Sequence, residues 1–197
     1  MELVRPGSAH LASYVAALER GWSPDNERGV VVAEEQLAQI AADAPGFLAA
    51  LENREGVGTV TLPDGSAVPR LPGFVRWMWD GEFCGSISLR WQAGTTALPP
   101  YCLGHIGYGV VPWKRRRGHA SAALAMILAQ AREFLPGLGL RFVELTTDLD
   151  NVGSQTVIAA NGGVLHEHFV KPAQFRNRPG LRFRVALTGP ETQAPAA

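Results

Sequence analysis

One junction in the sequence restricts the possible folds more than any other segment. LGHIGYGVV (103–111) has the composition of a strand, and apolar residues at helical spacing continue from about 118 to 135. Only a short basic turn, PWKRRRG (112–118), separates the two. A strand that passes directly into a helix predicts a mixed α/β (α+β) chain, in which helices pack on a sheet.

The rest of the chain continues this mixture of strands and helices. FVRWMWD (74–80) and FCGSISLRW (83–91) flank Asp80-Gly81 and predict an antiparallel hairpin, whereas residues 53–73 are rich in Gly and Pro and predict a long loop. The other expected elements are a strand at 2–5, a helix at about 9–20 capped by Ser8, a helix at 33–51 that Pro45 can divide, a strand at 141–148, a helix from Asn151 to about 161, and strands at 164–170 and 181–187. We expect one domain, 1–188, followed by a disordered tail, 189–197.

Composition excludes several classes of protein. Lys and Arg total 18 residues and Asp and Glu also total 18, so the zero net charge argues against a general nucleic-acid binder. The two cysteines, Cys84 and Cys102, have neither metal-ligand spacing nor the number that a disulfide framework requires. The sequence shows no signal peptide and no apolar run long enough for a membrane helix, so we expect a soluble cytoplasmic protein without a membrane partner.

The basic turn has the chemistry of a phosphate site. A helix start leaves backbone N–H groups without partners and carries a partial positive charge, so it binds phosphate readily. Gly118 allows close approach of a ligand, Ala120 and Ser121 keep the first turn narrow, and Lys114 to Arg117 add four positive charges. The alternative is a solvated basic loop before an ordinary helix. Walker and dinucleotide-binding glycine motifs are both absent from the sequence.

The segment Arg115-Arg116-Arg117-Gly118-His119-Ala120 fits the pattern Arg/Gln-x-x-Gly-x-Gly/Ala, and it follows Val110-Val111-Pro112. A second phrase, Asn151-Val152-Gly153-Ser154 and then Asn161-Gly162-Gly163, follows at the spacing of a β-α-β-α order. Together these motifs resemble the GNAT superfamily of N-acetyltransferases, most closely a group of poorly characterised bacterial acetyltransferases. The resemblance covers about 102–166 and implies a mostly antiparallel central sheet whose two central strands splay apart.

The resemblance also implies a binding mode for acetyl-CoA as the acyl donor. Backbone amides of the turn and helix start would hold the pyrophosphate, and the strand edge before the turn would pair with the pantetheine arm. An amide near Val110 would polarise the thioester carbonyl. The implied contact residues are Tyr108, Gly109, Val110, Arg115, Arg116, Arg117, Gly118, His119, Ala120, Ser121, Asn151 and Ser154.

The implied reaction is direct attack of a neutral primary amine on the thioester, which requires a proton acceptor and is helped by a proton donor for the thiolate. The tyrosine that often serves as the acid in this family would fall at position 158, which is Ile158. Tyr108 and Ser154 are the candidate acids. The candidate bases are His105, Glu144, Glu82 and Asp148, although a lone strand histidine is more often a packed core residue.

Other readings of the sequence remain open. The acyl group can be longer than acetyl, or the chain can be a non-catalytic acyl-CoA sensor, which the missing tyrosine at Ile158 makes worth testing. The acceptor is expected to be a small-molecule or peptide amine, and the protein a monomer or homodimer. Trp77, Trp79 and Trp91 are expected to be packing residues, and His166 and His168 lack an apparent third ligand for a metal, so none is expected.

Overall fold

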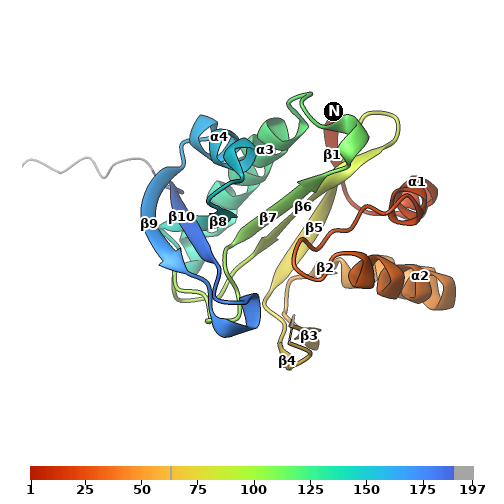
Figure 1. Cartoon of the computed structure of the whole chain (residues 1–197), viewed down its shortest axis with the longest axis horizontal. Helices are drawn as coiled ribbons and strands as arrows, with labels where there is room; N and C mark the ends of the chain where they lie inside the picture. Colours follow the sequence, from red (N-terminus) through yellow and green to blue (C-terminus); the bar gives the residue numbers. More distant parts are fainter. Residues whose placement is uncertain (63, 189–197) are drawn as a thin grey trace, which may run out of the picture.

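The basic turn joins a strand and a helix at the upper edge of the molecule in the view of Figure 1. The computed structural model describes residues 1–62 and 64–188. The helices are α1 (Ser8–Glu19), α2 (Val30–Ala50), α3 (His119–Phe134) and α4 (Val152–Ala160). The strands are β1 (Glu2–Val4), β2 (Glu52–Asn53), β3 (Thr59–Thr61), β4 (Ala67–Pro69), β5 (Gly73–Trp79), β6 (Phe83–Arg90), β7 (Ile106–Val110), β8 (Phe142–Asp148), β9 (Val164–Val170) and β10 (Pro179–Ala186).

The strands form two main antiparallel sheets rather than one continuous sheet. The first has the order β1-β5-β6-β7, with β2 paired to β5, and the second has the order β8-β10-β9. Strands β3 and β4 form a separate small hairpin. The two main sheets adjoin where β7 lies beside β8, and no ladder joins these two strands. The expected fold class, a mixed and mostly antiparallel α+β fold with splayed central strands, is confirmed.

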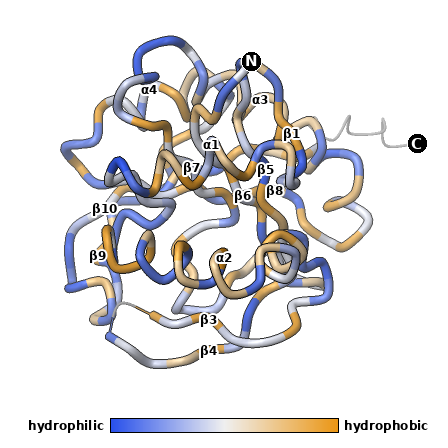
Figure 2. Tube along the Cα trace, turned by 90° about the vertical axis from the view of Figure 1, so that its right-hand side faces the viewer, coloured by the Kyte–Doolittle hydropathy of each residue, from blue (hydrophilic) through white to orange (hydrophobic). Residues whose placement is uncertain are grey.

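Helices cover both faces of the first sheet and so produce two cores. One core packs α3 and Ile158 of α4 against apolar side chains of β5, β6, β8 and β10. The other packs α1 and α2 against Trp77 of β5 and Phe83 of β6. Figure 1 shows the two pairs of helices on opposite sides of β5, β6 and β7, and Figure 2 shows hydrophilic stretches in the outer loops. The expectation that the tryptophans are packing residues is confirmed, since Trp77 and Trp91 are buried in the cores and Trp79 packs against one.

The starts of two helices can be compared with the capping serine and the proline in the sequence. Helix α1 begins at Ser8 itself, and Gly7 occupies the N-cap position without a side-chain cap, so the prediction that Ser8 caps the helix is wrong. Helix α2 is interrupted at Asp43, whose backbone is not helical. Asp43 Oδ1 accepts a hydrogen bond from the Gly46 amide at 2.9 Å. Asp43 therefore caps a second short helix with Pro45 in its first turn, so the expected division of the helix is confirmed.

The segment 53–73 is not the continuous loop that its composition predicts, because it contains the β3–β4 hairpin and the end of β2. Helix α3 ends at Phe134 and is followed by the 3-10 turn Pro136–Leu138, which agrees with the helical spacing expected from about 118 to 135. Residues 189–197, expected to be a disordered tail, lie outside the described residues. Within 1–62 and 64–188, no helix has the length and apolarity needed to cross a bilayer.

Candidate active site

Strand β7 presents one backbone edge to β6 and the other to an open cleft. The Val111 amide donates to the Cys84 carbonyl at 2.9 Å, which fixes the phase of the ladder at the end of β7. Bonded and non-bonded pairs alternate in an antiparallel ladder. The amides of Ile106, Tyr108 and Val110 therefore point away from β6, toward β8. Gly109 lies between Tyr108 and Val110, and its amide points toward β6. A Cβ built on Gly109 would lie 3.7 Å from the ring of Trp22.

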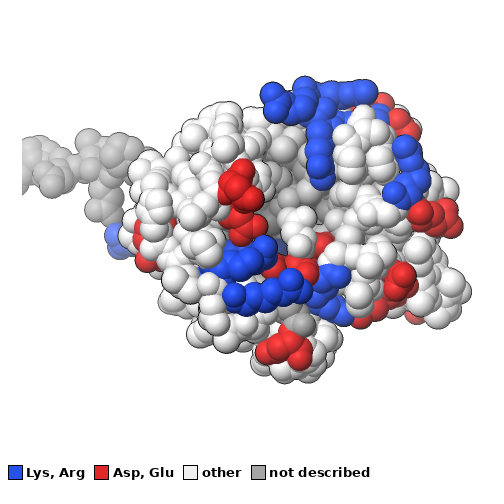
Figure 3. Space-filling view, viewed as in Figure 1, with Lys and Arg blue, Asp and Glu red and all other residues white. Residues whose placement is uncertain are grey.

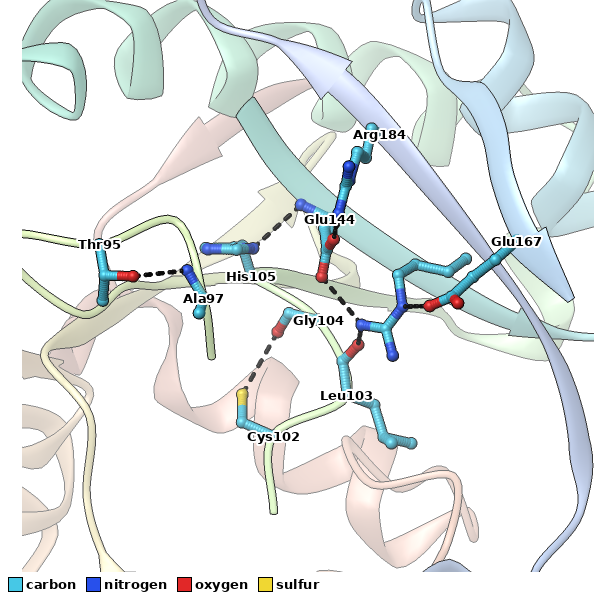
Figure 4. Close-up of polar contacts among 10 residues, drawn as sticks. Thr95, Ala97, Cys102, Leu103, Gly104, His105, Glu144, Glu167 and Arg184 are labelled. Atoms are coloured by element: carbon cyan, nitrogen blue, oxygen red, sulfur yellow. Dashed lines mark hydrogen bonds and ion pairs between the residues drawn. The ribbon is translucent and has the colours of Figure 1, made fainter. Parts of the chain in front are cut away.

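The cleft is closed at one end by a contact between His105 and Glu144 (Figure 4). The His105 amide donates to the Glu144 carbonyl at 2.8 Å, and the Glu144 amide donates to His105 Nδ1 at 2.9 Å. Gly104 allows this approach, because a Cβ there would lie 3.0 Å from the Glu144 carbonyl oxygen. Beyond this point the backbones of β7 and β8 have no ladder between them, and the cleft opens toward the basic turn.

His105 is part of the closed end and does not face the cleft. Its side chain has no exposed surface, and Nε2 has no hydrogen-bond partner within the described residues. Burial lowers its pKa from 6.5 to about 4. Because Nδ1 already accepts the Glu144 amide proton, the imidazole is neutral with its own proton on Nε2. This geometry argues for a structural role and against the role of general base.

Glu144, the second candidate base, is held by two arginines. Its Oε2 lies 2.8 Å from Arg182 Nη1, and its Oε1 lies 2.9 Å from Arg184 Nη2. The carboxylate is almost fully buried. Both carboxylate oxygens are therefore engaged by guanidinium groups rather than open to an incoming amine. The other two carboxylates are also paired: Glu82 lies 2.7 Å from Lys114, and Asp148 lies 2.6 Å from Lys171.

The basic turn ends in a row of unpaired amides at the start of α3. Gly118 is the N-cap with φ of 77°, and Arg116 also has a positive φ of 63°. Within the described part of the chain, the backbone amides from Arg116 to Ser121 have no acceptor, and no side chain caps the helix. Arg115 Nε donates to the Val110 carbonyl at 3.2 Å, which connects the turn to the end of β7. Such a row of donors at a helix start is a site for an anion with several phosphate oxygens.

Figure 3 shows basic side chains gathered over this turn, with a hollow in the surface beside them. Lys114 is not among the exposed ones, so the expectation that it adds charge around a phosphate is not met by its geometry. It is buried, and its Nζ lies 2.7 Å from both Asp80 Oδ1 and Glu82 Oε1. These hydrogen bonds raise the pKa of Lys114. Lys114 therefore anchors the turn to the β5–β6 hairpin.

One group of side chains near the turn has the chemistry of metal ligands. Asp80, Cys84 and His119 bring one ligand atom each within 4.8 Å of one another. The Lys114 ammonium group already pairs with Asp80, and burial raises the pKa of the Cys84 thiol to about 11. A cation there would have to displace Lys114 and deprotonate the thiol, so the cluster suits a salt-bridged support better than a metal centre. His166 and His168 lie on exposed β9, apart from this group.

Tyr108 and Ser154 meet across the cleft. Their hydroxyl oxygens are 2.9 Å apart, which joins β7 to the first turns of α4. Ile158 lies one turn further along α4, is buried, and lines the same cavity as Tyr108 and Ser154. Burial raises the pKa of Tyr108. A phenol therefore lies close to position 158, where the family resemblance expects a tyrosine.

Helix α4 is held in place by two asparagines. Asn151 is its N-cap, and its Oδ1 accepts from the Ser154 amide at 3.0 Å, so the helix begins where the sequence predicts it. The side chain of Asn151 also lines the cleft. Asn161 Nδ2 donates to Ser121 Oγ at 3.1 Å, which ties the end of α4 to the start of α3.

Two cavities meet at the open edge of β7. One, of about 360 Å³, lies among α2, β5 and β6, and the other, of about 440 Å³, lies between β7, β8 and the β9–β10 loop. Tyr108, Gly107, Arg90 and Asp25 line both cavities. Neither Arg90 nor Asp25 is predicted from the sequence to be a site residue. Arg90 ends a strand like many surface arginines, and Asp25 belongs to a loop without periodicity.

A third unexpected feature is an ionic cluster beside the second cavity. Lys171 is buried, and its Nζ lies 2.6 Å from Asp148 Oδ1 and 3.1 Å from Glu27 Oε1. Arg178 pairs with the same two carboxylates. The cluster connects the α1–α2 loop to β8 and to the β9–β10 loop, although these segments are far apart in the sequence. It therefore fixes the wall of the cleft opposite β7.

Comparison with known proteins identifies the family. The model of the acetyltransferase (GNAT) family matches residues 13–162. This protein belongs to the GNAT family of acetyltransferases. Membership makes it an acetyl-CoA-dependent N-acetyltransferase and agrees with the unpaired amides of Arg116 to Ser121 beside the splayed strands. No protein of curated function matches the sequence significantly.

Solved structures of acetyltransferases share the fold at low sequence identity. YncA of Salmonella typhimurium, a putative acetyltransferase solved with acetyl-CoA, is 15% identical with a TM-score of 0.54, and the alignment covers 100% of this chain and 98% of that one. RimL, a ribosomal alpha-N-protein acetyltransferase solved with coenzyme A, is 13% identical with a TM-score of 0.58, covering 93% and 92%. The spermidine N-acetyltransferase SpeG of Vibrio cholerae, as a point mutant, is 12% identical with a TM-score of 0.53, covering 94% of each chain.

Proposed function

We propose that this acetyltransferase moves the acetyl group of acetyl-CoA to a primary amine of a small molecule or peptide by direct attack. The amine nitrogen bonds to the thioester carbonyl carbon, and the C–S bond then breaks to release the CoA thiolate. The nitrogen loses one proton and the thiolate gains one. The observation that carries the proposal is the row of unpaired amides from Arg116 to Ser121 at the open end of the β7–β8 cleft.

The cofactor contacts follow from this row and from the free edge of β7. The amides of Arg116 to Ser121 would hold the pyrophosphate, with Arg115, Arg116 and Arg117 adding positive charge. The amides of Tyr108 and Val110 point into the cleft and are free to pair with the pantetheine arm. Asn151 keeps its Nδ2 group for the same arm, since only its Oδ1 caps α4. The Val110 amide would stabilise the negative charge that develops on the thioester oxygen.

Tyr108 is the proposed proton donor to the leaving thiolate. Its hydroxyl group lies 2.9 Å from Ser154 Oγ, beside the turn of α4 that carries Ile158. The raised pKa of Tyr108 keeps the phenol protonated at neutral pH. Ser154 orients the hydroxyl group, so both candidate acids from the sequence act at one place, Tyr108 as the donor and Ser154 as its partner.

Asp25 is the proposed proton acceptor for the attacking amine, directly or through water. It lines both cavities, and it has no cation partner within the described residues. Its Oδ1 accepts the amides of Glu27 at 2.7 Å and Arg28 at 2.8 Å, which fixes the carboxylate while Oδ2 keeps its lone pairs. The bases expected from the sequence are all engaged in other contacts. The ring of His105 accepts the Glu144 amide through Nδ1. The carboxylates of Glu144, Glu82 and Asp148 lie in ion pairs.

Titration calorimetry with acetyl-CoA tests the shared premise, and binding at micromolar concentrations is expected. No heat at high micromolar acetyl-CoA would contradict the proposal. Release of free CoA thiol is then measured against a panel of primary amines, with acetyl-CoA and longer acyl-CoA donors compared at equal concentration. Binding without turnover on any amine or donor would instead favour an acyl-CoA sensor.

A further inference from the structure

Arg90 ends β6 inside the active-site cleft. Within the described residues it forms no ion pair, in contrast to the arginines around Glu144 and Glu27. Its guanidinium group donates to Ser88 Oγ at 2.7 Å and lies 4.0 Å from Cys102 Sγ. A guanidinium group offers more N–H donors than these two contacts use, so part of its fork has no acceptor among residues 1–62 and 64–188.

The side chain lies over β7 on the face opposite α3. Alternation along β6 directs Ile87 and Leu89 into the α3 core, and Ser86, Ser88 and Arg90 to the other face. A Cβ built on Gly107 would lie 3.3 Å from Arg90 Nη2. The guanidinium group therefore lies directly above the strand along which the thioester is proposed to bind.

The charged side chains of the surrounding cavity match a ligand that carries an anionic group next to its amine. The charged residues that line the first cavity are Arg70, Arg90 and Asp25, so basic groups exceed acidic ones. Arg90 and Asp25 line both cavities but do not pair with each other. In the first cavity a polyamine would meet two arginines and one carboxylate. In the second cavity the further carboxylates, Glu27 and Asp148, already pair with Lys171 and Arg178. A compound with an amine and an anionic group matches Asp25 and Arg90 respectively.

We propose that the acceptor carries a carboxylate or phosphate group close to its amine and that Arg90 binds this anion. This inference rests on the proposed acetyl transfer and specifies the acceptor class for the same site. Gly107 and Val110 are three residues apart, or about 10 Å along a strand. The hydrogen bond to the anion and the approach of the amine to the carbonyl carbon take about 3 Å each. The amine and the anion must therefore lie within about 10 Å of each other, which an amino acid or an aminoalkyl phosphate satisfies.

Matched pairs of acceptors test the proposal in the full-length protein. Phenylalanine is compared with phenylalaninamide, and phosphoethanolamine with ethanolamine, each rate being corrected for the fraction of neutral amine. For the wild type we expect kcat/KM to be about 10- to 100-fold higher for the anionic member of at least one pair. The pair that shows the preference tells carboxylate from phosphate. Equal kcat/KM within both pairs would overturn the proposal.

Variants locate the effect at Arg90. Arg90→Gln should lower kcat/KM at least about tenfold more for the anionic acceptor than for its neutral partner, mainly through KM, and Arg90→Lys should restore part of the difference. Arg132→Gln, on α3 outside both cavities, is the matched control and should keep the wild-type preference. An equal loss on both acceptors in Arg90→Gln would contradict the assignment. If neutral and anionic amines are acetylated with equal kcat/KM, only the inference about the acceptor is contradicted. If acetyl-CoA does not bind, the proposed function itself is contradicted.

Discussion

His105 closes the narrow end of the cleft by binding Glu144 twice, through its backbone amide and through Nδ1 (Figure 4). The backbone of one residue on β8 thus pairs with the amide and with one ring nitrogen of the residue that precedes β7. This is the last point at which the two sheets are joined before they diverge. The cleft depends on this contact, because a continuous ladder beyond it would leave no free strand edge for a ligand.

This contact predicts a pH dependence of stability that belongs to His105. Its pKa is about 4 in the folded protein and 6.5 when exposed, so only the unfolded chain takes up its proton between these values. The contribution is therefore complete above pH 6.5 and is lost as the pH falls toward 4. The loss amounts to about 3 kcal/mol of the free energy of unfolding. Urea denaturation at several pH values measures it.

His105→Asn is the matched variant for this measurement, because the Asn oxygen can still accept the Glu144 amide proton. Its free energy of unfolding should fall less steeply between pH 6.5 and 4 than that of the wild type. The variant should also retain acetyl transfer, since His105 is buried away from the cleft. A loss of kcat by orders of magnitude in a folded, cofactor-binding His105→Asn protein would show that the imidazole takes part in the reaction.

A large side chain at Gly118 should block the phosphate turn. Gly118→Trp is expected to weaken acetyl-CoA binding about 100-fold or more, because the indole would cover the amides at the start of α3. Gly118 has φ of 77°, so the substitution also adds about 1–2 kcal/mol of backbone strain. Gly162→Trp is the control, since Gly162 has φ of 82° and similarly open surroundings at the end of α4. Calorimetry should show weak binding only for the Gly118 variant.

The parts of the proposed site that are local in sequence follow from short motifs. The phosphate turn, the α3 start and the Asn151 cap are each specified within a few residues by glycine, proline or a capping side chain. Their recognition needs no knowledge of which strands pair. The β7 amides that face the cleft follow from the same segment once its ladder with β6 is known.

The role of His105 and the acceptor residues could not be predicted in this way. The partner of His105 is 39 residues further along the chain, so the sequence shows only a histidine on a strand. Strands β3 and β4 have three residues each, too few for an alternating pattern to be recognised. The roles proposed for Arg90 and Asp25 follow only from the two cavities that the folded loops and strands enclose.

Removing the phenol at Tyr108 should slow the chemical step without preventing cofactor binding. In Tyr108→Phe, we expect kcat to fall about 100-fold, because the thiolate then leaves without its proton donor. The dissociation constant for acetyl-CoA should change only a few-fold. Ser154→Ala keeps the phenol and removes its 2.9 Å partner, so its loss of kcat should be smaller. If Tyr108→Phe keeps the wild-type kcat, another group or water protonates the thiolate.

The same tyrosine should leave kcat independent of pH on the alkaline side up to about pH 10. Burial raises the pKa of Tyr108 above its ordinary value of 10.0, so the phenol stays protonated up to that pH. The kcat of the wild type should therefore not decline between pH 8 and 10 through ionisation of this group. A profile measured with a saturating acceptor, in which a fall over this range disappears in Tyr108→Phe, would contradict the raised pKa.

Asp25→Asn should produce an enzyme that works only when the amine has already lost its proton. The Asn oxygen can accept the Glu27 and Arg28 amides as Oδ1 of Asp25 does, so the α1–α2 loop keeps its turn. The kcat/KM at pH 7 should fall about 100-fold and should recover toward the wild-type value as the pH rises through the pKa of the acceptor amine. Asp43→Asn, which conserves a similar turn contact in α2 away from both cavities, should leave the profile unchanged. A uniform loss at every pH would assign Asp25 to acceptor binding or to loop structure. Alkaline pH can compensate only for the loss of a proton acceptor.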